Sequence, residues 1–136
     1  MTPRPEALVL ETDAGPAALG QIEAHLRRTW EAHAHVPETV RIEVGIAAGE
    51  IGANIVEHAA AGRQVRIRME VRVLIDEVWV EFADDGVPAR VDLESVRMPD
   101  GLVERGRGLA LARAALDKLA YRRNSENHWT LVSKRF

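Results

Sequence analysis

Three polar residues, Glu50, Asn54 and His58, stand at intervals of four in the segment AAGEIGANIVEHA. Residues four apart in a helix share one face, so the carboxylate, carboxamide and imidazole would form a single polar row. A nucleotide-bound Mg²⁺ takes few protein oxygens, and Asn54 could supply one without adding charge. Glu50, one turn earlier, could accept a proton from a hydroxyl that attacks a terminal phosphate. Because such spacing also arises by chance in amphipathic helices, the row needs support from other motifs.

A first supporting motif is the turn Asp84-Asp85-Gly86, which follows an apolar strand pattern. An acidic acceptor at a strand end can receive a hydrogen bond from an exocyclic amine such as that of adenine. Gly86 lets the backbone approach a planar ring closely. We expect Asp84 to be the acceptor and Asp85 to be a turn residue, although Asp-Gly after a strand is a common turn in itself.

A second motif, Gly106-Arg107-Gly108, directly precedes a predicted helix. Free amides and the positive end of the helix dipole would face an anion bound there, and phosphates bind well at such positions. The sequence contains no GxxxxGK[ST] loop, and this motif lacks the third glycine of a dinucleotide fingerprint. The common nucleotide-binding folds are therefore poor matches.

The apolar periodicity predicts eight elements in the order βααββαββ. The residues expected in strands are 6–12, 64–73 and 78–84, the helices are 17–34, 38–60 and 108–119, and a terminal hairpin covers 121–136 with its turn at 124–127. Residues 87–105 are expected to form a long loop. This order is typical of an α+β two-layer sandwich, with a mixed, mostly antiparallel sheet covered on one face by helices.

Composition sets further limits. The 136 residues are the size of one domain, so residues 1–136 are expected to form a single domain. The absence of cysteine excludes disulfides and thiolate metal sites, and no secretory signal or membrane-length apolar run is found, so we expect a cytoplasmic protein without membrane contact. A net charge of -3 offers no overall attraction to nucleic acid.

Taken together and in order, GEIGANIVEHA, FADDGVP and ERGRGLALARAALDKLAYRR resemble the N box, adenine-binding turn and glycine box of one ATP-binding fold. Sensor histidine kinases, DNA gyrase, the Hsp90 chaperone and MutL share this fold. Within it, the sequence is most similar to the small bacterial anti-sigma factors of the RsbW and SpoIIAB type, which are also serine-protein kinases. The likeness runs from about Ala18 to the C-terminus. Pro88 stands where the wider family has a second glycine.

The resemblance implies a role for each motif residue. Glu50 would be the catalytic base, Asn54 the Mg²⁺ ligand, Asp84 the partner of the adenine amine and Gly86 a neighbour of the base, while Gly106, Gly108 and the amide of Leu109 would hold phosphates. The loop from residue 87 to 105 would be the ATP lid. His58 becomes a supporting or structural residue.

The resemblance also implies an activity. The chain would bind a sigma factor and use Mg²⁺ and ATP to phosphorylate a serine or threonine of a STAS-type anti-sigma antagonist, and it could form homodimers. The alternative is an ATP-binding docking module of the same fold without kinase activity. Since Lys118 and Lys134 are the only lysines and lie outside the phosphate motif, we expect Arg105 or Arg107 to supply the side-chain cation near the transferred phosphate.

Overall fold

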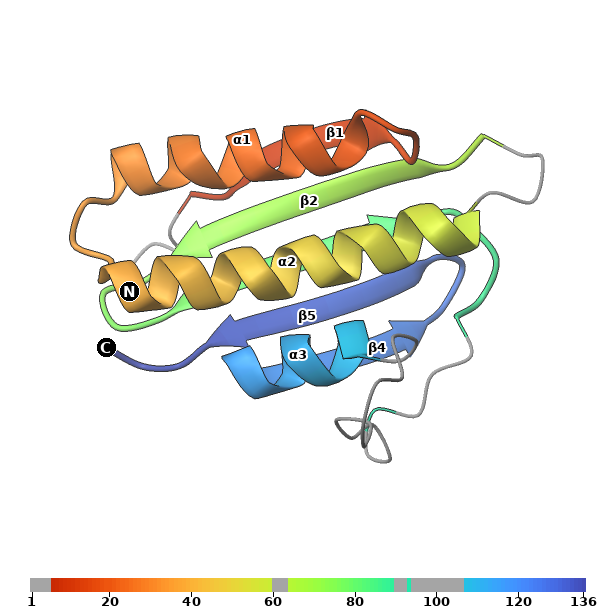
Figure 1. The fold of residues 1–136 in the computed structure, drawn as a ribbon. Helices are drawn as coiled ribbons and strands as arrows, with labels where there is room; N and C mark the ends of the chain where they lie inside the picture. The colour runs from red at the N-terminus through yellow and green to blue at the C-terminus, as the bar shows by residue number, and fades with distance from the viewer. Residues whose placement is uncertain (1–5, 60–63, 90–92, 94–106) are drawn as a thin grey trace.

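The computed structural model describes residues 6–59, 64–89, 93 and 107–136. The elements, in chain order, are β1 (Leu8–Asp13), α1 (Ala18–Ala32), α2 (Glu38–Ala59), β2 (Arg66–Val73), β3 (Val78–Asp84), α3 (Arg107–Ala115), β4 (Leu116–Arg123) and β5 (Asn127–Ser133). This is the predicted order. The helices lie together on one face of the sheet (Figure 1), so the predicted α+β two-layer sandwich is confirmed.

The five strands form one sheet in the order β1-β2-β3-β5-β4. All four pairings are antiparallel, so the described strands include no parallel pair of the kind that a mixed sheet would have. The end of β3 pairs with the start of β5: Asp84 lies opposite Asn127. This pairing brings residues more than forty positions apart in the sequence to the same end of the sheet.

The core lies between the sheet and the helices. Inward residues of the strands include Met69, Phe82 and Trp129, each no more than 1% exposed. Helices α1 and α2 pack closely where Gly52 meets Ile22. A Cβ atom added to Gly52 would lie only 2.7 Å from Ile22 Cδ1, so a larger residue here would force the buried Ile22 side chain to shift.

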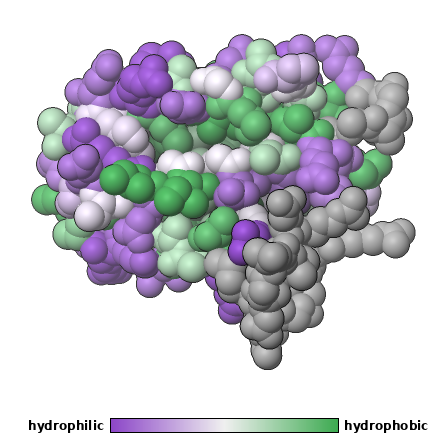
Figure 2. Space-filling model, viewed as in Figure 1, coloured by the Kyte–Doolittle hydropathy of each residue, from purple (hydrophilic) through white to green (hydrophobic). Residues whose placement is uncertain are grey.

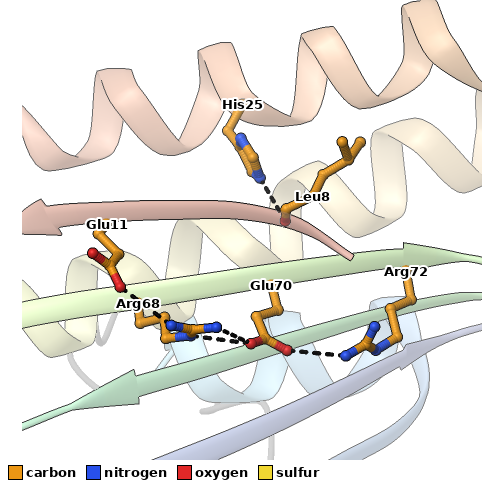
Figure 3. A network of polar contacts seen from close by, with 6 residues as sticks. All are labelled: Leu8, Glu11, His25, Arg68, Glu70 and Arg72. Atoms are coloured by element: carbon orange, nitrogen blue, oxygen red, sulfur yellow. Dashed lines mark hydrogen bonds and ion pairs between the residues drawn. The ribbon is translucent and has the colours of Figure 1, made fainter. Parts of the chain in front are cut away.

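The opposite face of the sheet is charged, as the alternation of β2 predicts. Arg68 donates hydrogen bonds to Glu11 at 3.2 Å and to Glu70 at 2.7 Å, and Glu70 also accepts one from Arg72 at 3.4 Å (Figure 3). On the helical side, His25 Nε2 lies 3.0 Å from the carbonyl oxygen of Leu8 and connects α1 to β1 (Figure 3). The network accounts for the polar pattern without any ligand.

One boundary prediction was wrong. The helix expected over 108–119 ends at Ala115, and β4 begins at the next residue. Leu116 and Leu119 fit the helical spacing, but in the structure they pair with Ser133 and Leu131 of β5. Hydrogen bonding to a neighbouring strand, with burial of Leu116 and partial burial of Leu119, outweighs local helical periodicity here. The terminal hairpin is therefore longer than predicted, while its turn before Asn127 is where we expected it.

None of the helices in the described ranges is both long enough and apolar enough to cross a membrane.

Candidate functional site

A hollow lies at the end of the sheet where α2, β3 and β5 meet. Its lining consists of Asn54, Ile55, His58, Asp84, Gly86, Val87, Ala89, Asn127 and Trp129. The free space at its centre is about 10 Å³, close to that of one water-sized sphere. A purine could therefore bind only if lining side chains move apart.

Asp84 is the buried acid of this hollow, with only 3% of its surface exposed. Its Oδ1 accepts hydrogen bonds from Asn127 Nδ2 at 2.9 Å and from the amide of Gly86 at 3.0 Å. Oδ2 accepts no hydrogen bond from the described residues, and no fully buried side-chain oxygen of the described chain lacks a partner. Oδ2 therefore keeps some contact with solvent and can accept a further donor.

Burial raises the pKa of Asp84, because the charged form loses its hydration. Three groups act in the opposite direction and favour the carboxylate: the hydrogen bond from Asn127, the amide of Gly86 and the positive charge of Arg123. The site thus holds a desolvated acid that is supported by donors from two sides.

Gly86 is required by its closeness to Asp84. A Cβ atom at Gly86 would lie 2.9 Å from Asp84 Oδ1, where a real Cβ would force a shift. Asp85, in contrast, is not among the residues that line the hollow, and its Oδ1 accepts a hydrogen bond from the amide of Arg66 at 2.8 Å. This agrees with the expectation that Asp85 is a turn residue.

The predicted base and the predicted phosphate motif meet at the start of α3. A Cβ atom at Gly108 would lie 2.5 Å from Glu50 Oε2, so the carboxylate of α2 is packed directly against this glycine. Arg107 opens α3 and is exposed, and Leu109 follows in the first turn, half-buried against the core. The sequence motifs that we expected to act on phosphate are thus neighbours in space.

Not every predicted residue can be placed. Arg105, Gly106 and most of the predicted lid (90–92 and 94–105) lie outside the described residues. Asn54 and His58 both line the hollow, so His58 belongs to the site's surroundings although its side chain is exposed. The row predicted along α2 therefore serves two places: Glu50 contacts Gly108, whereas Asn54 and His58 line the hollow that Asp84 also lines.

Sequence reasoning missed the contribution of the last hairpin. Asn127, expected only in a turn, bonds Asp84, and Trp129, expected only as a residue of the terminal hairpin, lines the hollow. Tyr121 and Arg123 of β4 add hydrogen bonds to Ala89 and Gly86. Pairing of the predicted strands could have indicated these residues, because an antiparallel pair of β3 and β5 places the start of β5 beside the end of β3.

A second hollow, larger than the one around Asp84, lies elsewhere on the described surface. A groove of about 530 Å³ runs between α1 and α2, and its lining includes Leu19, Trp30, Ile42 and Ile46. Figure 2 shows apolar side chains gathered over these two helices. The groove contains only Glu23 and Arg27 as charged groups, which form an exposed ion pair with each other at 3.3 Å. Its lining offers no arrangement for chemistry.

In the described ranges, no three histidine, cysteine, aspartate or glutamate side chains gather into a metal-binding cluster. A magnesium ion bound with a nucleotide does not need such a cluster, because phosphates and waters supply most of its ligands. A single protein oxygen such as that of Asn54 is compatible with this chemistry.

An antiparallel sheet covered by helices, with a buried acid at its end and a nearby helix that has a glycine in its first turn, has the architecture of histidine kinase-like ATPase domains. Residues 13–134 match the family model of the histidine kinase-like ATPase domain. The chain belongs to this family. A search of curated proteins found no significant match.

The chain is also similar to a solved structure, the crystal structure of the RsbU and RsbW domains of Rv1364c from Mycobacterium tuberculosis. The TM-score is 0.65 and the identity is 18%, with 96% of this chain covered. The chain spans only 32% of that longer one. At this identity the likeness establishes the shared fold.

Proposed function

We propose that the chain is an ATP-binding anti-sigma factor with serine/threonine-protein kinase activity, and that it phosphorylates an anti-sigma antagonist. The observation that carries the proposal is the contact between Glu50 and Gly108 close to a hollow that contains Asp84. One end of the molecule thus combines an acceptor for a base, a helix start for phosphates and a carboxylate for proton transfer. Membership of the histidine kinase-like ATPase family supports the nucleotide part.

Base recognition is assigned to Asp84. Its accessible Oδ2 accepts a hydrogen bond from the exocyclic amine of adenine, while Oδ1 stays bonded to Asn127 and Gly86. Gly86 lets the backbone beside the carboxylate approach a planar ring closely once the lining side chains have moved apart.

Phosphoryl transfer is assigned to the start of α3 and to Glu50. The first amides of α3, including that of Leu109, are free of helical partners and face the phosphates, together with Gly106 and Gly108. Glu50 accepts the proton of the antagonist's serine hydroxyl as that oxygen bonds to the γ-phosphorus. The bond between the γ-phosphorus and the bridging oxygen breaks, and ADP leaves with that oxygen.

Magnesium is assigned to the side-chain oxygen of Asn54, which lies one helical turn after Glu50 and lines the hollow. When bound, the ion neutralises charge on the phosphates. Arg107, exposed at the first residue of α3, and Arg105 are the proposed side-chain cations near the transferred group.

The proposed partners are a sigma factor, a STAS-type antagonist and a second copy of the chain. The solved neighbour is described as containing RsbU and RsbW domains, and the RsbW likeness supports the partner-switching assignment. Phosphorylation of the antagonist would stop it from displacing the sigma factor. No contact with nucleic acid or membrane is part of the proposal, and the proposed location is the cytoplasm.

The test is transfer of radiolabel from ATP to a cognate antagonist that has been identified by pull-down from the source cell. We expect transfer by the native chain and its loss in Glu50→Gln, with ATP affinity kept within a few-fold. The matched control is Glu57→Gln, an exposed glutamate two turns further along α2, which should keep full transfer. ATP binding without transfer by the native chain would refute the kinase assignment and leave the docking module.

A further inference from the structure

The carboxamide of Asn127 is bonded at both of its polar atoms. Its Nδ2 donates to Asp84 Oδ1 at 2.9 Å and to the carbonyl oxygen of Val87 at 2.8 Å, and its Oδ1 accepts from the hydroxyl of Tyr121. Turning the carboxamide by half a turn would point its oxygen at a carboxylate and a carbonyl, which are both acceptors. Hydrogen-bond chemistry therefore determines its orientation.

Tyr121 continues this chain of hydrogen bonds. Its hydroxyl donates to Asn127 and accepts from the amide of Ala89 at 3.0 Å. Its ring packs against Trp129, its partner across the β4–β5 pair, with the ring centroids 4.6 Å apart. The ring is thus held by packing and the hydroxyl by two hydrogen bonds. Linked hydrogen bonds of this kind strengthen one another.

The sheet register explains why these groups meet. Asp84, Asn127 and Arg123 are successive partners across β3, β5 and β4, so their side chains share one row and one face. Arg123 Nη1 donates to the carbonyl oxygen of Gly86 at 2.8 Å. Backbone groups of residues 86, 87 and 89 are therefore all held by side chains of the terminal hairpin.

We propose that Tyr121 and Asn127 are positioning residues for base recognition. Their side chains form hydrogen bonds with Oδ1 of Asp84 and with the backbone of Val87 and Ala89. Oδ2 is then the one carboxylate oxygen of Asp84 that faces the base. This inference rests on the proposed nucleotide binding and adds the residues that set base specificity. A fixed acceptor favours a purine with an amino group at position 6 and repels one with a carbonyl there. A carboxylate free to rotate discriminates less.

The experiment compares the dissociation constants of ATP and ITP, measured by fluorescence titration on the full chain with Mg²⁺. Tyr121→Phe keeps the ring on Trp129 and removes only the hydroxyl, and Asn127→Ala removes the donors to Asp84. We expect ATP affinity to fall about threefold to tenfold in Tyr121→Phe and about tenfold or more in Asn127→Ala. The preference for ATP over ITP should narrow in both variants.

The matched control is Asn124→Ala in the turn of the same hairpin. Asn124 accepts a hydrogen bond from the amide of Glu126 at 3.0 Å and does not line the hollow. This variant loosens the hairpin without touching the network, so the ATP-to-ITP ratio should stay at the native value. A second measurement, exchange of the Ala89 amide without nucleotide, should be faster in Tyr121→Phe than in the control.

The outcomes distinguish the proposed nucleotide binding from the positioning role of Tyr121 and Asn127. A native chain that binds neither nucleotide overturns the proposed function and this inference together. A native chain that prefers ATP, with an unchanged ATP-to-ITP ratio in Tyr121→Phe and Asn127→Ala, overturns only the inference. A loss of ATP affinity with the ratio unchanged assigns both residues a merely structural role and also overturns it.

Discussion

Asp84→Asn exchanges one carboxylate oxygen for an amino group and keeps the size of the side chain. In the native chain, Oδ1 of this residue accepts hydrogen bonds from Asn127 and Gly86. The amide oxygen of the variant can keep both bonds, which places its NH₂ where Oδ2 now lies. The exocyclic amine of adenine would then face a donor in place of an acceptor.

The size of the effect follows from two losses. A hydrogen bond to a charged acceptor contributes about 1.5–3 kcal/mol, and leaving a buried donor without a partner costs about 1–3 kcal/mol. Together they amount to about 2.5–6 kcal/mol, which corresponds to roughly 10²-fold to 10⁴-fold weaker ATP binding. The control Asp85→Asn alters the neighbouring acid, which bonds the amide of Arg66, and should leave affinity within a few-fold.

The same variant tests the electrostatics of the free protein. Burial raises the pKa of Asp84 above its ordinary value of 3.8, so the folded state holds the proton more strongly than the unfolded state. The stability that this group contributes is fully present below the unfolded pKa and is lost as the pH rises through the folded pKa. The uncharged side chain of the variant has no such loss. Its free energy of unfolding, relative to that of the native chain, should therefore increase as the pH rises from below 3.8 through the raised pKa of Asp84.

Urea unfolding at several pH values and ATP titration at neutral pH measure the two effects separately. Retention of ATP affinity within a few-fold would show that Asp84 is not the acceptor of the base. A relative stability that falls with increasing pH would show that desolvation does not dominate at this carboxyl. Either result refutes the corresponding part of the reasoning.

Two glycine contacts provide further predictions, both testable as double-mutant cycles of urea unfolding. In a Glu50→Ala background, Gly108→Ala should stabilise the chain by about 0.5–1 kcal/mol, as alanine usually does in a helix. In the native background the new methyl group would lie 2.5 Å from Glu50 Oε2, and this clash should cancel or reverse the gain. Equal effects in both backgrounds would rule out the contact. Gly52→Ala should destabilise by about 1–3 kcal/mol, because its methyl group would lie 2.7 Å from Ile22 Cδ1. Ile22→Val removes that methyl and should recover part of the loss, and strict additivity would contradict this.

The parts of the structure that could be predicted from sequence are those with strong local signals. Alternating apolar residues correctly predicted β2 and β3 as strands, and the apolar face correctly predicted α2 as a helix. The predicted order of elements is also confirmed. The end of α3 could not be found in this way, because Leu116 and Leu119 satisfy both a helical and a strand pattern. Their assignment depends on β5, which lies more than ten residues further along the chain.

The site likewise contains residues with a local sequence signal and residues whose place depends on distant strands. Glu50, Asn54 and Gly108 belong to motifs whose spacing is local, and the structure brings the first and third into direct contact. Asn127 and Tyr121 have no motif of their own. Their positions depend on the register of three strands, and neither residue type marks a nucleotide site without that register.

Phosphate chemistry and base recognition are proposed for different parts of the fold, so each should be able to change without the other. The proposed phosphate chemistry lies on ends and faces of helices, where a carboxylate meets a helix start across a contact between α2 and α3. The proposed base recognition lies on the sheet, where Asp84 is held by a partner strand through hydrogen bonds of fixed direction. Substitutions at Glu50 should therefore alter transfer with little change in base preference, whereas substitutions at Asn127 should alter base preference first. A Glu50→Gln variant with an altered ATP-to-ITP ratio would show that the two regions are coupled and would contradict this separation.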